Sequence, residues 1–510
     1  MHEPVKIFSA AQIRRADQFT IDQEPVLSEQ LMERAASRCA EWIQGRFSKE
    51  KPILVFCGPG NNGGDGLVIA RLLLLAGYET LVYIFSGSGN YSPDFILNEG
   101  RLQQLNPACI HVIHNESFIP ELSDQAIIID ALLGTGLSKP VTGLAQQIIS
   151  RINTSGAMIV SVDIPSGLFA DQHSGSDAAI VRANTTLSFQ FPKLAFFFAE
   201  NAEYVGDYQI LPIGLSETFM QQEPTKHFQL TRDFIKTLLR SRKKFSHKGN
   251  YGHALLIAGS DGMSGAAVLA AKACLRSGVG LLSVQIPASA YTIMQTANPE
   301  AMVLTDSDAA AITDLIDLQP YNAVGIGPGI RTGTKTQEMF LQLIKQQKPL
   351  VIDADALNIL GLHKDWLERI PEQSVLTPHP KEFERIAGKS ANDFERHEKQ
   401  LAFSKKHKLF LVLKGAHTCI TTPEGDSYFN ITGNPGMAKG GSGDVLTGII
   451  TSLLAQSYTA KEACLLGVYI HGAAGDLASN EKGETGMIAG DLCEYLPAAF
   501  KKLNEPDVKP

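Results

Sequence analysis

The chain has 510 residues, of which 44% are hydrophobic and 19% charged. A chain this apolar is not intrinsically disordered, and at roughly 150 residues per domain its length predicts two or three domains. Because 53 acidic side chains outnumber 45 basic ones, the net charge of -8 argues against a protein that binds nucleic acid.

The cysteines and the N-terminus favour a soluble protein of the cytoplasm. The seven cysteines lack the close pairs of zinc sites and redox motifs, so we expect buried free thiols in a reducing compartment. The first residues lack the apolar core of a signal peptide, and no apolar run approaches the ~18 residues that span a membrane. We therefore expect no membrane partner.

Alternating strand and helix patterns predict an α/β fold. Apolar runs end in turns rich in glycine or aspartate and lead into helical patterns at residues 51–77, 125–136, 157–168, 253–278 and 349–360. This alternation is typical of parallel sheets with crossover helices.

A polar stretch without periodicity, residues 216–231, separates two such series. We place a boundary near residue 223, which predicts α/β domains of residues 1–222 and 223–510. The two halves share a pattern but no motif, so fusion of two different units is the simpler interpretation.

A glycine-rich loop at residues 57–66 follows an apolar strand and opens a helix. Glycine at this density lets backbone N–H groups approach an anion at the helix N-terminus. Gly58, Gly60 and Gly63 match Gly-x-Gly-x-x-Gly, but the strand at 80–85 is not followed by the acidic residue that holds a ribose. No Gly-Lys-Ser/Thr follows either, so the loop is not a Walker A motif. Taken alone, it fits a structural turn as well as a phosphate site.

Two aspartates end later strands of the same half. Asp130 ends the run IIID and Asp163 ends the run IVSVD, and ligands bind at the carboxyl ends of such parallel strands. Either residue alone fits a helix cap, but the pair together with the glycine loop favours a ligand site. The oxygens of Asn62, Asp130 and Ser166 suit a hard cation, whose identity does not follow from spacing.

The motifs GPGNNGGDG (58–66), DALLGTGL (130–137) and VDIPSGL (162–168), with LMERAAS near the N-terminus, resemble the NAD(P)HX epimerase family. The resemblance covers most of residues 10–215. It implies a Rossmann-like three-layer sandwich that interconverts the (R) and (S) epimers, at C6, of hydrated NADH or NADPH. A rival interpretation is an RNA-processing scaffold of the same fold, but such scaffolds lose the acidic and glycine positions that this sequence keeps.

The same resemblance assigns residues to the first site. It implies that Asp163 is the acid/base catalyst at the reacting ring and that Asn62, Asp130 and Ser166 hold potassium. The residues that it implies to line the dinucleotide are Asn61, Asn62, Gly63, Gly64, Asp65, Gly134, Thr135, Gly136, Leu137, Ser138, Lys139, Pro140 and Asp163.

In the second half, the glycine-rich residues 437–444 lead directly into a helix with an apolar stripe. This turn builds an anion hole at the helix N-terminus. Asp444 lies beside this anion hole, where its charge would repel a bound phosphate. We therefore favour a role of Asp444 as a base directed at a hydroxyl group that attacks phosphorus. An aspartate in a first helical turn also interacts favourably with the helix dipole, and the residues alone leave both interpretations open.

The segment GGSGDVLTG (440–448) is similar to the anion-hole motif of ribokinase-like folds. With HKGNYGHALLIAGS (247–260), DADALN (353–358), LTPHPKEFERI (376–386) and VLKGAHT (412–418), it resembles the ADP-dependent NAD(P)HX dehydratase family. The resemblance covers nearly all of residues 235–500.

The second resemblance implies that Asp444 is the catalytic base and that ADP is a co-substrate used with magnesium, for which no motif names the ligands. It implies that the hydrated dinucleotide contacts Ala266, Gly329, His379 and Asp444. A single histidine such as His379 is also often only a structural hydrogen-bonder. The residues implied to bind the adenine nucleotide are Lys414, Gly415, Ala416, His417, Thr418 and Gly443.

Together the two resemblances imply a metabolite-repair enzyme. One half would epimerise NAD(P)HX, and the other would convert (S)-NAD(P)HX to NAD(P)H, AMP and phosphate at the expense of ADP; family analogy also implies a homo-oligomer. The alternative is a small-molecule kinase for a vitamin precursor or sugar, fused to a ligand- or RNA-binding module. A kinase would leave a stable phosphorylated product.

Overall fold

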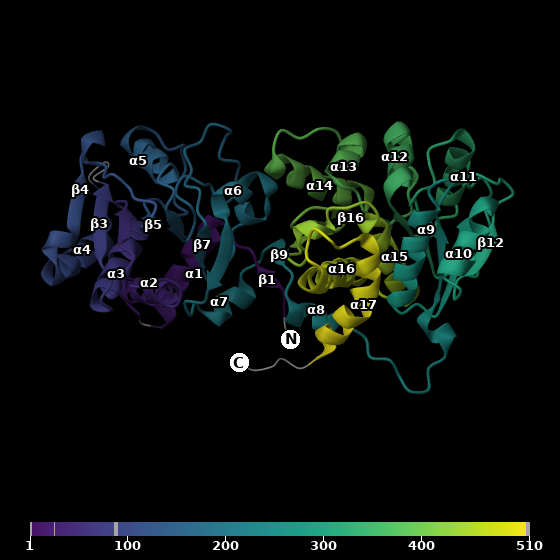
Figure 1. Cartoon of the computed structure of the whole chain (residues 1–510), viewed down its shortest axis with the longest axis horizontal. Coiled ribbons are helices and arrows are strands. Elements are labelled where there is room, and N and C mark those ends of the chain that lie inside the picture. Colours follow the sequence, from purple (N-terminus) through teal and green to yellow (C-terminus); the bar gives the residue numbers. More distant parts are fainter. Residues whose placement is uncertain (1–2, 25, 86–89, 506–510) are drawn as a thin grey trace. The chain divides into compact units, whose positions relative to one another are not determined.

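The computed structural model describes residues 3–24, 26–85 and 90–505, and it divides into two compact units (Figure 1). The N-terminal unit comprises residues 6–225 and 392–394. The C-terminal unit comprises residues 226–391 and 395–510 with residues 1–5, as far as these are described. Each unit is built on its own sheet.

A seven-stranded parallel sheet forms the N-terminal unit, in the order β4-β3-β2-β5-β6-β7-β8. Its strands are β2 (Ile53–Cys57), β3 (Thr80–Phe85), β4 (Ile110–Ile113), β5 (Ile127–Ala131), β6 (Met158–Val162), β7 (Thr185–Phe189) and β8 (Asp207–Leu211). Its helices are α1 (Ala10–Gln23), α2 (Ser28–Gln44), α3 (Asn61–Leu75), α4 (Pro93–Leu105), α5 (Gly143–Asn153), α6 (Ala202–Val205) and α7 (Glu217–Gln222).

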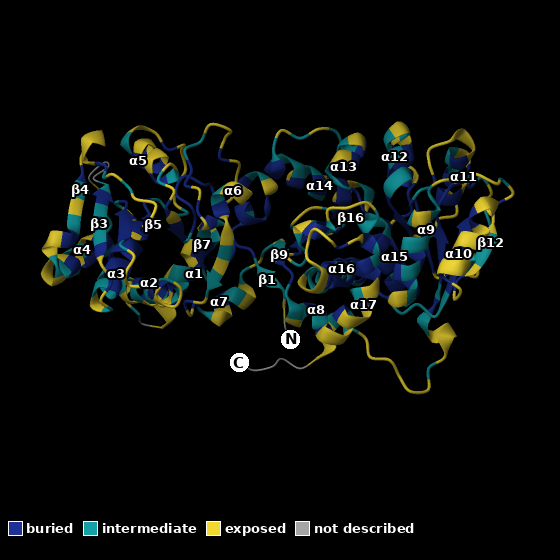
Figure 2. Cartoon of the chain, viewed as in Figure 1, coloured by how far each residue is buried: buried dark blue, intermediate teal, exposed yellow. Residues whose placement is uncertain are grey.

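The central strands of this sheet are covered on both faces. Along β2, Val55 packs in the apolar cluster of α2, α3 and α4, whereas Phe56 packs in the cluster of α5. Figure 2 shows the resulting layers, with buried strands between helices whose outer sides are exposed. Because β2 and β5 are buried on both faces, their sequences are continuous apolar runs. The covering of both faces confirms the expected three-layer α/β arrangement of this unit.

The C-terminal unit contains an eleven-stranded sheet in the order β1-β9-β18-β17-β16-β15-β14-β13-β10-β11-β12. Its strands are β1 (Val5–Lys6), β9 (His227–Gln229), β10 (His253–Ile257), β11 (Leu281–Ile286), β12 (Met302–Thr305), β13 (Ala323–Ile326), β14 (Leu350–Ile352), β15 (Val375–Leu376), β16 (Phe410–Leu413), β17 (Cys419–Thr421) and β18 (Ser427–Phe429). Strands β10 to β16 pair in parallel. The antiparallel pairs β16–β17 and β17–β18 were not predicted from the strand–helix alternation.

Helices cover both faces of this sheet as well. They are α8 (Arg232–Leu238), α9 (Ser264–Arg276), α10 (Tyr291–Ala297), α11 (Thr334–Ile344), α12 (Ala354–Leu362), α13 (Pro380–Ala387), α14 (Asp393–His407), α15 (Ser442–Ala455), α16 (Ala460–Lys482) and α17 (Ala489–Asn504). Val351 of β14 packs in the cluster of α15, α16 and α17, whereas Ile352 packs in the cluster of α11 and α12.

The cysteines and the helices bear on two of the expectations from the sequence. All seven cysteines are buried and form no disulfide, which confirms the expected free thiols. Within residues 3–24, 26–85 and 90–505, no helix is both long enough and apolar enough to cross a membrane.

The packing of α15 against α9 depends on Gly448. A Cβ at this position would overlap the carbonyl oxygen of Ala270 and lie 3.0 Å from the Cβ of Ala273. In an exposed helix, replacing glycine by alanine stabilises the fold by about 1 kcal/mol. We expect the clash to outweigh this gain, so Gly448→Ala lowers the unfolding temperature. Gly100→Ala in α4 is the matched control, because its Cβ meets no atom within 4 Å and should raise the unfolding temperature. A stabilised Gly448→Ala protein would contradict this packing.

Candidate functional site

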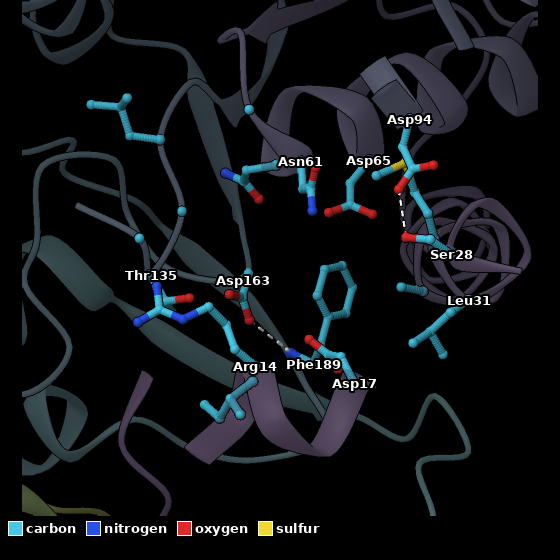
Figure 3. Close-up of a pocket in the computed structure, with 18 of the residues that line it drawn as sticks. Arg14, Asp17, Ser28, Leu31, Asn61, Asp65, Asp94, Thr135, Asp163 and Phe189 are labelled. Carbon is cyan, nitrogen blue, oxygen red and sulfur yellow. Dashed lines mark hydrogen bonds between the residues drawn. The ribbon is translucent and has the colours of Figure 1, made fainter. Parts of the chain in front are cut away.

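A cavity of about 560 Å³ lies at the carboxyl ends of the central strands of the N-terminal unit. The register of the sheet pairs Phe56 of β2 with Asp130 of β5, and Asp130 with Ser161 of β6. Parallel pairing therefore brings the glycine loop, Asp130 and Asp163 to one edge of the sheet. Figure 3 shows Asn61, Asp65 and Asp163 around the same hollow, although they are far apart in the sequence.

Close backbone packing explains the glycines that follow β2. A Cβ on Gly58 would overlap the carbonyl oxygen of Leu132, and a Cβ on Gly63 would overlap the carbonyl oxygen of Gly58. Helix α3 can therefore begin at Asn61 directly beside the β5 loop, with its N-terminus at the cavity. A helix N-terminus in this position favours a phosphate group.

Asp130 is fully buried, and donors surround its carboxylate. The hydroxyl groups of Ser161 and Ser166 donate to it over 2.7 and 2.5 Å, and the backbone N–H of Ser166 donates over 2.9 Å. Burial raises the pKa of Asp130, and these hydrogen bonds oppose the rise. Asn62 is also buried, but neither its amide oxygen nor its amide nitrogen has a hydrogen-bond partner among the described residues. The side chain of Asn62 lies against Gly134. In the same loop, the backbone N–H of Leu133 donates a hydrogen bond to the Ser166 hydroxyl.

Asp163 follows β6 and reaches the cavity through an unusual backbone conformation. Its φ of 65° lies in the left-handed region, and its N–H donates to Leu187 over 2.7 Å. The carboxylate forms a short ion pair with the ammonium group of Lys193 and accepts a hydrogen bond from the N–H of Phe189. Lys193 is completely buried, so its charge is not screened by solvent.

The structure brings many of the predicted residues of the first half to this cavity, but not all of them. Those that line it are Asn61, Asn62, Asp65, Gly134, Thr135, Gly136, Leu137 and Asp163. Gly63 and Gly64 are buried and do not line the cavity, and neither do residues 138–140. Sequence reasoning missed several charged residues that lie at or beside the cavity, namely Arg14, Asp17, Asp94 and Lys193. The sequence feature that could have identified Lys193 is a lysine that closely follows an apolar strand.

A second group of polar residues gathers at the strand ends of the C-terminal unit. Asp353 follows β14 and is almost fully buried. Its carboxylate accepts hydrogen bonds from the Lys414 ammonium group over 2.8 Å and from the Thr447 hydroxyl over 2.7 Å. A Cβ on Gly443 would lie 3.2 Å from the Lys414 Nζ, so the glycine of the predicted anion hole lies directly against this ion pair.

Lys414, which the resemblance implies to bind the adenine nucleotide, is engaged by carboxylates. Its ammonium group is paired with Asp353 and lies 3.9 Å from Glu382. Burial opposes the charged form, but the two carboxylates outweigh it and raise the pKa of Lys414. Lys414 therefore carries a fixed positive charge under the N-terminus of α15.

Asp444 lies in the first turn of α15 with an altered acidity. Burial, and then the charge of Asp353, raises its pKa to about 7, although Lys414 acts in the opposite direction. A carboxyl group with a pKa near neutrality is suited to proton transfer. The turn before it is held by His471, whose Nε2 lies 3.0 Å from the carbonyl oxygen of Ser442. Burial lowers the pKa of His471 to about 4, so it is neutral and donates to this carbonyl.

The other residues predicted for the second site occupy neighbouring loops. A Cβ on Gly329 would lie 3.1 Å from the Cβ of Ala266, so these two are in contact. His379 caps α13, because its Nδ1 accepts the N–H groups of Lys381 and Glu382. This is the structural role that the sequence left open for His379, and its Nε2 lies 3.4 Å from a carboxylate oxygen of Glu382.

No compact metal centre of the usual kind is present in the described parts of either unit. Residues 3–24, 26–85 and 90–505 contain no group of three or more histidine, cysteine, aspartate or glutamate side chains placed to hold one ion.

Comparisons with known proteins cover both units of the chain. Residues 28–195 match the family model of the YjeF-related protein N-terminus, and residues 254–498 match that of NAD(P)H-hydrate dehydratase. The bifunctional NAD(P)H-hydrate repair enzyme of Moorella thermoacetica is 35% identical over 98% of this chain and 97% of its own length. The chain belongs to the family of bifunctional NAD(P)H-hydrate repair enzymes. The repair enzyme of Escherichia coli is 32% identical over 99% of this chain and 95% of its own length.

Solved structures similar to this repair enzyme cover its second half. The ADP/ATP-dependent NAD(P)H-hydrate dehydratase from Bacillus subtilis, co-crystallised with ATP and Mg²⁺, is 33% identical with a TM-score of 0.47. It covers 54% of this chain and 97% of its own. A ribokinase-like superfamily protein from Enterococcus faecalis is 27% identical with a TM-score of 0.49, over 56% of this chain and 99% of its own.

The acidity of Asp444 predicts how stability changes with pH. Because the pKa of about 7 in the folded state lies above the unfolded value of 3.8, the unfolded chain loses this proton first. The carboxyl group therefore destabilises the fold progressively as pH rises from about 4 to 7. We expect Asp444→Asn to raise the unfolding temperature of the C-terminal unit more at pH 8 than at pH 5. The control Asp365→Asn, on the surface, should change it little at either pH. An equal effect of Asp444→Asn at both pH values would contradict this environment.

Proposed function

We propose that residues 1–222 epimerise NAD(P)HX and that residues 223–510 dehydrate (S)-NAD(P)HX with ADP, releasing NAD(P)H, AMP and phosphate. One observation carries the proposal: each unit places an acidic side chain beside a helix N-terminus at the carboxyl ends of parallel strands in its own sheet. A helix N-terminus binds phosphate and the carboxyl group moves a proton, which are the two tasks that each reaction needs.

In the first site, Asp163 acts on the hydroxylated C6 of the nicotinamide ring. C6 is a hemiaminal carbon, so acid/base assistance at its hydroxyl group and at the ring nitrogen lets a bond to C6 break, and its configuration scrambles through an iminium or ring-opened species. The ion pair with Lys193 holds the Asp163 carboxylate at the cavity as a proton acceptor. The loops at 61–65 and 134–137 bind the rest of the dinucleotide, whose phosphates face the N-terminus of α3.

We further propose that Asn62, Asp130 and Ser166 hold potassium beside this site. The buried amide oxygen of Asn62 has no partner among the described residues, and Asp130 supplies a buried carboxylate. These groups and the Ser166 hydroxyl are hard oxygen ligands, which suit a hard cation. A bound cation would neutralise Asp130 and order the loop at 132–134 against the substrate.

In the second site, Asp444 takes the proton of the C6 hydroxyl as its oxygen bonds to the β-phosphorus of ADP and the bond to AMP breaks. Phosphate then leaves C6 and a proton leaves C5, which restores the ring double bond. Gly443 leaves room for a phosphate beside Lys414, whose charge stabilises the transferred group. Ala266, Gly329 and His379 line the side on which the dinucleotide binds.

Magnesium fits this site only together with the nucleotide. The Asp353 carboxylate is already engaged by Lys414 and Thr447, and Mg²⁺ is commonly held by one or two carboxylates plus substrate phosphates. Magnesium would then neutralise the phosphates of ADP during transfer. We assign no protein ligand to it.

Two variants separate the activities. With an equilibrated mixture of NADHX epimers, ADP, magnesium and potassium, NADH absorbance should rise in a fast phase for the (S) epimer and a slow phase for the (R) epimer. Asp444→Asn should abolish both phases, because no other group takes the hydroxyl proton. Asp163→Ala should keep the fast phase and slow the second by about 10² to 10⁴, the usual contribution of a general acid or base.

Mixing the two variants provides the control. Each supplies the activity that the other lacks, so the mixture should recover NADH from both epimers. If the Asp444→Asn protein still regenerates NADH, or if the mixture restores nothing although both variants are folded, the two-site proposal is wrong.

A further inference from the structure

A second carboxyl group points into the N-terminal cavity from α1. Ile13, Arg14, Asp17 and Ile21 lie on one face of this helix and line the cavity. Asp17 is the acidic residue of that face, and Figure 3 shows it at the same end of the hollow as Asp163. Within the described part of the chain, no group forms a hydrogen bond or ion pair with its carboxyl group. An acid that is half buried and without a partner in a substrate cavity requires an explanation.

Lys193 makes Asp17 and Asp163 chemically different. Its ammonium group donates to Asp163, to the Ser188 hydroxyl over 2.7 Å and to the Phe191 carbonyl over 3.3 Å. An ammonium group has three N–H donors, so all of them are engaged. The ammonium group is therefore fully engaged with Asp163, Ser188 and Phe191, and no donor of Lys193 remains to bind Asp17.

The surroundings of Asp17 favour its protonated form. Burial, and then the charge of Asp163, raises the pKa of Asp17 to about 7, while the more weakly acting charge of Lys193 lowers it. At neutral pH the carboxyl group therefore carries a proton in about half of the molecules. The other charged side chains at this cavity or next to it are Arg14, Asp65, Asp94 and Asp171.

We propose that Asp17 is the proton donor of the N-terminal site and acts as a pair with Asp163 as the acceptor. The inference rests on the proposed epimerase function and adds a residue to it. Two carboxyl groups that line one cavity, one paired with an ammonium group and the other without a partner among the described residues, suit a substrate that must lose and gain protons at neighbouring atoms. In NAD(P)HX these atoms are the C6 hydroxyl oxygen and the ring nitrogen N1, both bonded to C6.

The step balances without an external reactant. Asp163 takes the hydroxyl proton, the O–H electron pair becomes the second bond of an aldehyde, and the C6–N1 bond breaks. The electron pair of that bond moves to N1, which receives the proton of Asp17. Rotation about the C5–C6 bond exposes the other face of the aldehyde. Attack by N1 on that face returns the N1 proton to Asp17 and the Asp163 proton to the new hydroxyl group.

Asp65 is the competing donor. It also lines the cavity, and burial followed by the charges of Asp163, Asp17 and Asp94 raises its pKa. However, it lies in α3 just after the first turn of the helix, within residues 61–65, which we propose to bind the dinucleotide. The geometry thus favours Asp17 as donor and Asp65 as a group next to the bound dinucleotide, and the two assignments can be tested separately.

The test compares Asp17→Asn, Asp65→Asn and the control Asp22→Asn in the full-length protein. Asp22 belongs to the same helix but is exposed and outside the cavity. Epimerisation is followed as the slow phase of NADH recovery, with an excess of the Asp163→Ala protein as coupling dehydratase so that dehydration does not limit the rate. We expect Asp17→Asn to slow this phase at least 10²-fold and Asp22→Asn to leave it within twofold.

The pH profile distinguishes a donor from a merely structural residue. Since the protonated form of Asp17 is active, the wild-type slow phase should decrease as pH rises through about 7. The residual rate of Asp17→Asn should lack this decrease, and Asp17→Glu should retain it at a lower rate. If Asp17→Asn fails to fold, the pH profile of Asp17→Glu alone tests whether Asp17 is the proton donor.

Three outcomes overturn the inference. These are an Asp17→Asn rate within threefold of wild type, a pH profile that is the same in Asp17→Asn and wild type, and a loss of the slow phase in Asp65→Asn but not in Asp17→Asn. Failure of the proposed function looks different, because a wild-type protein that never recovers the (R) epimer has no epimerase activity for Asp17 to support.

Discussion

In both units, parallel strands end at the same edge of a sheet, and this alignment brings together residues that are far apart in the sequence. In the N-terminal unit the register of β2, β5 and β6 places a glycine loop, Asp130 and Asp163 around one cavity. In the C-terminal unit the ends of β14 and β16 place Asp353 against Lys414. A shift of one residue in either sheet would turn these side chains to the opposite face and dismantle the site.

At both sites a carboxyl group is buried to an extent that makes its ionised form unfavourable. Asp17 and Asp444 each have a pKa raised to about 7, and the first cause in both cases is burial. A lysine lies near each of them but is paired with another aspartate, Lys193 with Asp163 and Lys414 with Asp353. The fold thus pairs one carboxylate of each site with an ammonium group and leaves the other carboxyl group near its midpoint at neutral pH, as proton transfer requires.

Sequence patterns predicted the parts of this arrangement that depend on local order. Apolar runs followed by glycine or aspartate identified the strand ends, and with them Asp130, Asp163 and the loop at 58–66. The role of Asp17 was not predictable in this way, because α1 carries several polar residues and only its docking decides which of them faces the cavity. The pairing of Lys414 with Asp353 was missed for a similar reason, since 61 positions separate them and only the sheet order makes them neighbours.

We propose that two different sites on one chain act in sequence on one small molecule. The stoichiometry of the wild-type reaction tests this most directly, with both NADHX epimers, ADP, magnesium and potassium. If both sites act, NADH recovery equals the total hydrate supplied, with one AMP and one phosphate released for each NADH. If a stable phosphorylated product accumulates without NADH, the chain is instead a small-molecule kinase.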